Sequence, residues 1–180
     1  MNDFLTAIFR LAIFRGTPAA MPSAPLWLAI VCAVSFVVML IVLSTPLGAN
    51  DSLPVYLSYN VIIYGTVALL LLANRRQQRL VQTMIAMLAV DNVLTLAQAL
   101  AVVVASRYSL VAAMPVWPVT FWLLFAQSRI LGSALDWHPA IALIFLFVIA
   151  LLGASLVSAI GGPIDGATEA VAATSLLGFG

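Results

Sequence analysis

The sequence predicts an all-α, polytopic integral membrane protein with five transmembrane helices and an amino-terminal interfacial amphipathic helix. Hydrophobic residues make up 64% of the chain and charged residues only 7%, with a mean hydropathy of +1.19. A soluble domain carries about a quarter charged residues, so this chain cannot cover a water-exposed surface. Because the backbone must satisfy its own hydrogen bonds in lipid, long apolar stretches are expected to be helices.

Five apolar stretches, separated by short polar segments, supply these helices. Each approaches or exceeds the roughly 20 residues that a helix needs to cross the ~30 Å hydrocarbon core of a bilayer. They cover residues 26–43, 53–73, 80–104, 116–135 and 139–160. The chain therefore divides into a cytoplasmic interfacial helix with a Pro-rich connector (1–25), a five-helix transmembrane domain (26–160) and an external, mobile tail (161–180).

The amino-terminal segment is predicted to form a helix with one broad apolar face. Asp3, Thr6 and Arg10 fall in a narrow polar sector of a helical projection, opposite an apolar arc. Such a helix lies in the headgroup region with its apolar face in the acyl boundary. Packing against a partner protein is the alternative. The residues expected at the membrane surface are Phe4, Leu5, Ile8, Phe9, Leu11, Arg10 and Arg15.

The positions of the arginines predict the orientation in the membrane. Arg10 and Arg15 precede the first stretch, and Arg75, Arg76 and Arg79 lie between the second and the third. Positively charged loops stay on the cytoplasmic side. The amino terminus is therefore expected inside and the carboxyl terminus outside. The net charge of +1, without a basic stripe, argues against a nucleic-acid partner.

Two ionisable side chains fall inside the predicted spans, Asp91 in the third and Arg129 in the fourth. Charged groups in hydrocarbon are costly, and they are usually paired or functional. Residues at one depth in these two antiparallel helices have numbers that sum to about 220, if both helices rise equally. Asp91 and Arg129 satisfy this relation, so we expect an ion pair between them.

Further polar residues extend this pair into a predicted intramembrane cluster. Asp91, Thr95 and Gln98 share one helix face by their i, i+4, i+7 spacing. The full set is Asp91, Asn92, Thr95, Gln98, Gln127, Arg129, Asn60 and Tyr64. Such groups either lock helices together or carry protons or substrates. An adjacent arginine would keep Asp91 ionised, which favours a structural role over a proton shuttle.

Sequence patterns typical of catalytic and cofactor sites do not occur. His138 is the single histidine and Cys32 the single cysteine, so zinc, copper or haem sites built on several such ligands are not expected. The sequence contains no Gly-x-Ser-x-Gly elbow, no phosphate-binding loop and no His-Glu-x-x-His motif. We therefore expect no cofactor and no enzymatic activity from this chain alone.

The segments FRL (9–11) and FRG (14–16), the prolines that lead to Leu26 and the five close-set helices resemble the bacterial branch of the Ypt-interacting (Yip) family. The similarity covers residues 4–160 and is architectural, because the Asp-Leu-Tyr-Gly-Pro type sequence of the eukaryotic members has no counterpart here. The resemblance implies non-enzymatic, partner-dependent membrane organisation. It also implies the plasma (inner) membrane of a bacterium, and it transfers no functional residue.

Together these patterns predict a scaffold or accessory subunit of a larger membrane assembly. Its expected partners are the lipid bilayer and other integral membrane proteins. The alternative is a small transporter or proton-coupled permease centred on Asp91 and Arg129. A third interpretation is a membrane-embedded enzyme subunit whose cofactors lie on other chains.

Overall fold

The computed structural model describes residues 2–45, 53–107 and 116–161. Within these residues every regular element is a helix. The elements are α1 (Asn2–Ala12), the 3-10 helix η1 (Pro18–Ala20), α2 (Pro25–Leu43), α3 (Leu53–Ala73), α4 (Gln77–Arg107), α5 (Val116–Leu135) and α6 (Pro139–Gly161). The tail beyond α6, expected to be external and mobile, lies outside the described residues.

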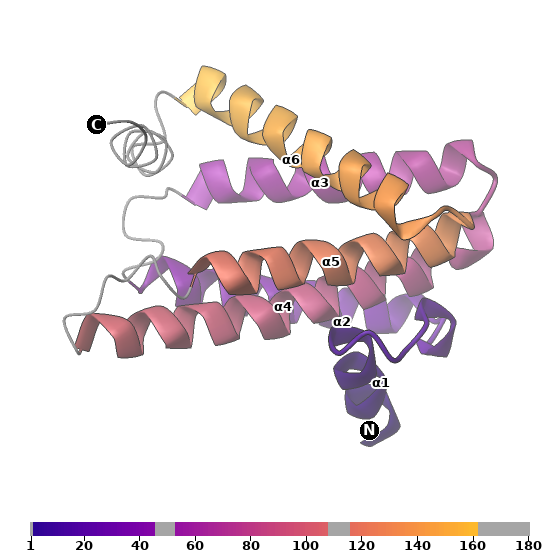
Figure 1. Cartoon of the computed structure of the whole chain (residues 1–180), viewed down its shortest axis with the longest axis horizontal. Coiled ribbons are helices and arrows are strands. Elements are labelled where there is room, and N and C mark those ends of the chain that lie inside the picture. Colours follow the sequence, from indigo (N-terminus) through magenta and orange to yellow (C-terminus); the bar gives the residue numbers. More distant parts are fainter. Residues whose placement is uncertain (1, 46–52, 108–115, 162–180) are drawn as a thin grey trace.

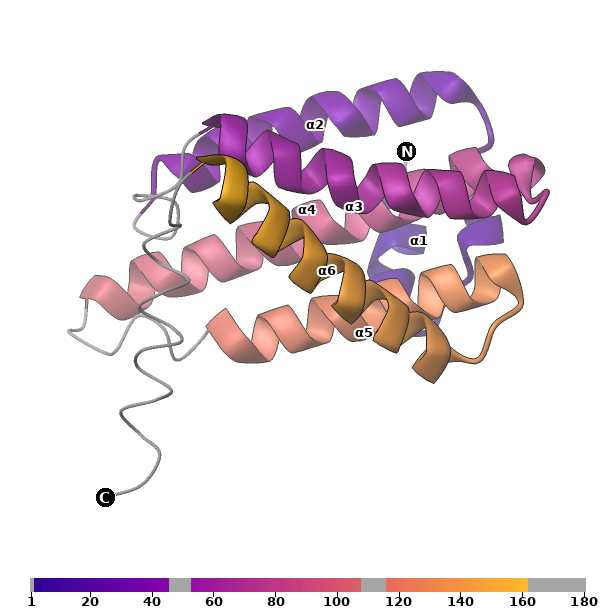
Figure 2. The same ribbon diagram turned by 90° about the horizontal axis from the view of Figure 1, so that it is seen from above.

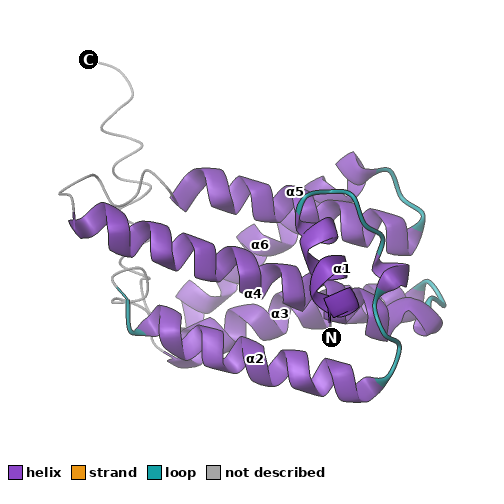
Figure 3. Cartoon of the chain, turned by 90° about the horizontal axis from the view of Figure 1, so that it is seen from below, coloured by secondary structure: helices purple, strands orange, loops and turns teal. Residues whose placement is uncertain are grey.

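The five long helices form two layers. In Figure 1, α3 and α6 make the upper layer, and α2, α4 and α5 make the lower one; the view from above in Figure 2 agrees. Helix α4 is central, since it packs against α1, α2, α3 and α5, while α6 packs against both α3 and α5. The short α1 runs across the direction of the long helices, on the underside of the lower layer (Figure 3).

Four of the described helices are long and apolar enough to cross a membrane. They are Pro25–Leu43, Leu53–Ala73, Gln77–Ala105 within α4 and Pro139–Leu156 within α6. Helix α5, predicted from the sequence as the fourth of five spans, is not among them. Its 20 residues include Gln127, Ser128 and Arg129, which lower its mean hydropathy. A membrane-spanning role for α5 therefore stays a prediction.

The buried core of the bundle lies where α4 packs against α3 and α5. Side chains that are fully enclosed include Leu71 of α3, Ile85 and Met87 of α4, and Ile130 and Leu131 of α5. The opposite faces of the long helices carry exposed leucine, isoleucine, valine and phenylalanine side chains. An apolar outside around a packed inside is what a helical bundle needs in lipid.

Helix α1 is docked on the bundle through part of its apolar face. Ile8, Leu11 and Ala12 are buried, and α1 contacts α4 and α5. We expected Ile8 and Leu11 at the membrane surface, so their burial in the protein core corrects that expectation. The exposed part of the apolar face is Leu5 (59%) and Phe9 (63%), one helical turn apart.

Three helices end in the same way, with a residue other than glycine in the left-handed conformation. Phe14 (φ 62°), Arg75 (φ 56°) and Asp136 (φ 58°) follow α1, α3 and α5. In each case the next residue donates its N–H back to the helix; after α5, Trp137 N–H reaches Gly132 O at 2.8 Å. These bonds satisfy carbonyls that would otherwise lack partners, and they reverse the chain within a short turn.

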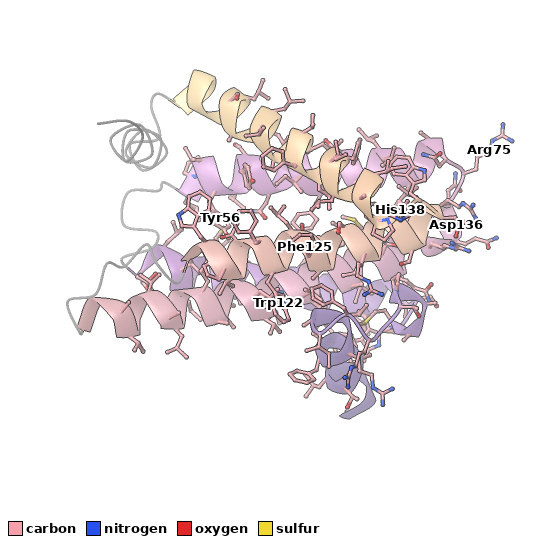
Figure 4. All side chains as sticks on the ribbon, in the orientation of Figure 1. Tyr56, Arg75, Trp122, Phe125, Asp136 and His138 are labelled. Carbon is pink, nitrogen blue, oxygen red and sulfur yellow. The ribbon has the colours of Figure 1, made fainter. Side chains whose placement is uncertain are left out.

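Two of these turns are tied together at one end of the bundle. Arg76 and Arg79 both form ion pairs with Asp136, and Arg79 Nη1 lies 3.1 Å from Asp136 Oδ1. Arg79 also donates to Ala134 O at 3.3 Å, near the end of α5. Figure 4 shows Arg75, Asp136 and His138 together at this end, and Tyr56 toward the other. Hydrogen bonding from Arg79 is the main reason that the pKa of Asp136 lies below its ordinary value.

Candidate functional site

The candidate site is a polar cavity between the two layers, centred on Asp91. Asp91 projects from α4, and Tyr64 of α3 forms a side-chain hydrogen bond with its carboxylate. Gln127 of α5 forms a further side-chain hydrogen bond with Tyr64. Three helices therefore meet at one carboxylate, through one phenol and one amide.

The main cavity beside Asp91 has a volume of about 290 Å³. Asp91, Thr95 and Gln98, the three residues predicted to share a face of α4, all line it. The polar lining from the other helices is Tyr56, Tyr59, Asn60 and Tyr64 of α3 with Thr120 and Gln127 of α5. Leu146 and Ala150 of α6 add apolar lining.

A smaller cavity of about 180 Å³ lies on the other side of Asp91, between α2, α3 and α4. Asn92, which the sequence places beside the polar face, lines this second cavity and is buried. Cys32 and Ser35 contribute the α2 wall. Asp91 lines both cavities, as do Tyr56, Asn60, Tyr64 and Thr95.

Hydrogen bonds hold the lining in place. Gln98 Nε2 of α4 donates to Thr120 Oγ1 of α5 at 3.3 Å. Asn60 Nδ2 donates to the carbonyl of Tyr56 on its own helix at 2.9 Å. Asn60 therefore uses a donor within α3, while its side chain still lines both cavities.

Arg129 does not belong to this site. Its side chain is exposed, and its guanidinium carbon lies 5.8 Å from the centroid of the Phe14 ring. Among the described residues, the ion pairs are those of Arg76 and Arg79 with Asp136. The predicted pair of Asp91 with Arg129 is therefore wrong.

The physical reason is rotation about the helix axis. Matched residue numbers fix the depth of two side chains, but not the direction in which each points. At about 100° per residue, Gln127 and Arg129 point to nearly opposite sides of α5. Gln127 is buried and faces the cavity, so Arg129 faces outward.

The cavity lining also includes three residues that the sequence pattern did not single out, namely Tyr56, Tyr59 and Thr120. A signal for the tyrosines was present, because Tyr56, Asn60 and Tyr64 recur every four residues and Tyr59 lies on the same broad face. Aromatic residues in an apolar stretch more commonly serve packing, which hid that signal. Thr120 gave none, since it is an isolated polar residue near the start of α5.

The lining suits a small solute with hydrogen-bonding groups and a positive charge. One carboxylate offers the charge, while phenol, amide and hydroxyl groups offer both donors and acceptors. Within residues 2–45, 53–107 and 116–161 no three His, Cys, Asp or Glu side chains converge as a metal site would require. A carboxylate beside phenol, amide and hydroxyl groups can hold a cation or a proton.

Comparison with protein-family models, with curated proteins and with solved structures finds no match to this chain. Its function therefore has to be inferred from the side chains themselves.

Proposed function

We propose that this chain is a small, non-enzymatic membrane transporter that carries a proton or a small cationic solute through the cavity at Asp91. The observation that supports this most directly is that Asp91 lines two cavities and that, among the described residues, no ion pair joins it to an arginine. A carboxylate in the middle of a membrane span is costly, and such residues commonly mark ion or substrate pathways. The internal ion pair with Arg129, which favoured a structural role for Asp91, is not among the ion pairs of the described residues.

A transport site needs room for its occupant and groups that hold it. The cavity of about 290 Å³ accommodates several water molecules or a small amine, at about 30 Å³ for each water. A bound cation would neutralise Asp91 and so reduce the cost of its charge in the membrane. Tyr64 of α3 holds the carboxylate by a hydrogen bond, and Gln127 of α5 in turn bonds to Tyr64.

The proposal includes five spans, a cytoplasmic amino terminus and an external carboxyl terminus in a bacterial inner membrane. Helix α5 packs against both α4 and α6, which contain candidate spans. This packing supports counting α5 as a further span. Cysteine labelling tests this in a Cys32→Ala background. A membrane-impermeant reagent should reach cysteines at Asn50, Ser109 and Ala167, but not at Gln77. External labelling at Gln77 would reverse the orientation.

Transport is tested in proteoliposomes with a potassium-diffusion potential across the membrane; a pH-sensitive dye inside reports protons, and radiolabel uptake reports sodium and methylammonium. Three probes are supplied in turn: protons alone, sodium and methylammonium. We expect the wild-type chain to pass at least one of them, and Asp91→Asn to fall to the level of empty vesicles. Asp136→Asn, which removes a carboxylate far from the cavity, is the matched control and should retain transport. Wild-type vesicles that pass none of the three probes would contradict the proposal.

A scaffold or accessory subunit of a membrane assembly is the second candidate. Helix α1, which runs across the long helices, supports this second candidate. Its Leu5 and Phe9 lie one turn apart, and both side chains are exposed. With Arg10 and Arg15, both exposed, they form a surface suited to the lipid headgroup region or to another membrane protein. The likeness in layout to the Yip family favours the same role. Purification in mild detergent that yields a stable heteromeric complex, with no flux, would favour this candidate.

A further inference from the structure

A groove on the outer face of α5 and α6 combines an apolar wall with one cationic end. Its volume is about 650 Å³, and its wall includes Phe121, Trp122 and Phe125 of α5 and Leu143 of α6. Figure 4 labels Trp122 and Phe125 on α5. Arg129 and Phe14 line the same groove. It lies on the opposite side of α5 from Asp91, so it is separate from the proposed transport site.

Arg129 is the cation of this groove, and within the described residues it has no carboxylate partner. Its guanidinium lies over the Phe14 ring, which restrains the group without neutralising its charge. Pro139 and Ala140, the first residues of α6, line the groove as well. The amino-terminal end of a helix carries a partial positive charge, which adds to that of Arg129.

Contacts with the amino-terminal segment hold the wall of the groove, whose length is close to the thickness of one membrane leaflet. Trp122 Nε1 donates to Ala12 O at 2.7 Å, and the Trp122 ring stacks on Phe14 at 5.2 Å. From Pro118 to Arg129 the groove follows roughly 16 Å of helix at 1.5 Å per residue. That length is about half of the ~30 Å hydrocarbon thickness.

We propose that this groove binds one anionic phospholipid, with the phosphate at Arg129 and an acyl chain along the aromatic wall. A soluble anion would leave the apolar wall unused, whereas a phospholipid matches both parts of the groove. A zwitterionic lipid brings its own ammonium group, which offsets the phosphate. An anionic headgroup leaves the negative charge free to compensate the unpaired arginine.

Native mass spectrometry of the delipidated, full-length protein in detergent tests this proposal. Phosphatidylglycerol and phosphatidylcholine with identical acyl chains are titrated separately. We expect one phosphatidylglycerol to bind about fivefold more tightly than phosphatidylcholine, the size expected for one added charge contact near a membrane surface. Equal binding of the two lipids would overturn the proposal.

Four variants identify the groove as the site. Arg129→Gln should abolish the preference for phosphatidylglycerol, and Arg129→Lys should keep most of it. Arg10→Gln is the matched control, because it removes one exposed positive charge from α1 outside the groove; equal losses in Arg10→Gln and Arg129→Gln would indicate surface charge alone and contradict the site. Phe125→Ala should weaken both lipids without changing the preference.

A competitor separates the lipid from a free anion. Glycerophosphoglycerol, which has the headgroup but no chains, should not displace the bound lipid at equal concentration. Full displacement would show a soluble phosphate site instead. Asp91→Asn should leave the lipid preference unchanged, so failure of the transport proposal and failure of this one are distinguishable.

Discussion

The indole Nε1–H of Trp122 on α5 donates a 2.7 Å hydrogen bond to the carbonyl oxygen of Ala12, the last residue of α1. Together with the buried Ile8 and Leu11, this bond fastens the amino-terminal helix to the bundle. Helix α1 is therefore a docked part of the fold, with only Leu5 and Phe9 left on its outer apolar face.

Replacing Trp122 by Phe should loosen α1. The variant keeps an aromatic ring near Phe14 but leaves the Ala12 carbonyl without its donor, at a cost of about 1–3 kcal/mol. Hydrogen exchange over residues 4–12 should increase, and the melting temperature in detergent should fall. Trp117→Phe, on the same helix but in contact with Phe121, is the control and should leave exchange in α1 unchanged. Unchanged exchange in both variants would show that the bond does not hold α1.

Asp91 and Arg129 should behave as independent residues. Asp91 lines the cavity on one side of α5, and Arg129 lines the groove on its other side. The stability changes of Asp91→Asn and Arg129→Gln should therefore add within about 0.5 kcal/mol in the double variant. Thermal or denaturant unfolding of the four forms in one detergent measures the coupling. Recovery of stability in the double variant would show that the two charges are paired after all.

The ion pairs of Asp136 with Arg76 and Arg79 should weaken in acid. Because Arg79 holds the pKa of Asp136 below its ordinary value of 3.8, the folded protein binds this proton less readily than the unfolded chain does. The stabilisation is therefore present above pH 3.8 and is lost as the pH falls through the lower pKa of the folded state. Wild type should melt at a higher temperature than Asp136→Asn at neutral pH, and the two should converge in acid. A constant difference at all pH values would exclude titration of Asp136 as the cause.

Arg75 allows a test of the energetic cost of a left-handed backbone conformation just after a helix. Its φ of 56° is unfavourable for a residue with a side chain, whereas glycine adopts it freely. Arg75→Gly should therefore raise the stability of the fold by about 1 kcal/mol, and Arg75→Val should lower it by more. Unfolding midpoints of both variants provide the measurement. Arg75→Gln, which keeps a long side chain without the charge, separates the backbone effect from the loss of charge.

The helices themselves were predictable from the sequence. The expected stretch 53–73 coincides with α3, and 116–135 with α5, because polar and Pro/Gly-rich segments interrupt the apolar runs where helices end. Helix α4 is longer than its apolar stretch, since Gln77 to Arg79 continue the helix in polar residues. Apolar runs locate the part of a helix that can lie in hydrocarbon, and not the turns that extend beyond it.

The candidate site was predictable only in part, because residue spacing fixes a face within one helix but not the rotation of one helix against another. The shared face of Asp91, Thr95 and Gln98 follows from spacing alone, and all three line the cavity. The partner of Asp91 did not follow, because the estimate of depth selected Arg129 without showing in which direction its side chain points. Packing of the whole bundle selects Tyr64, by turning Gln127 inward and Arg129 outward.

The two short turns at 74–76 and 136–138 both carry the chain from one layer to the other, and Asp136 joins them through Arg76 and Arg79. The two layers are thus fastened to each other at one end by charge. Among the described residues no ion pair joins the layers at the other end. A surface carboxylate, remote from the cavity, thus joins two segments that lie 57 positions apart in the sequence.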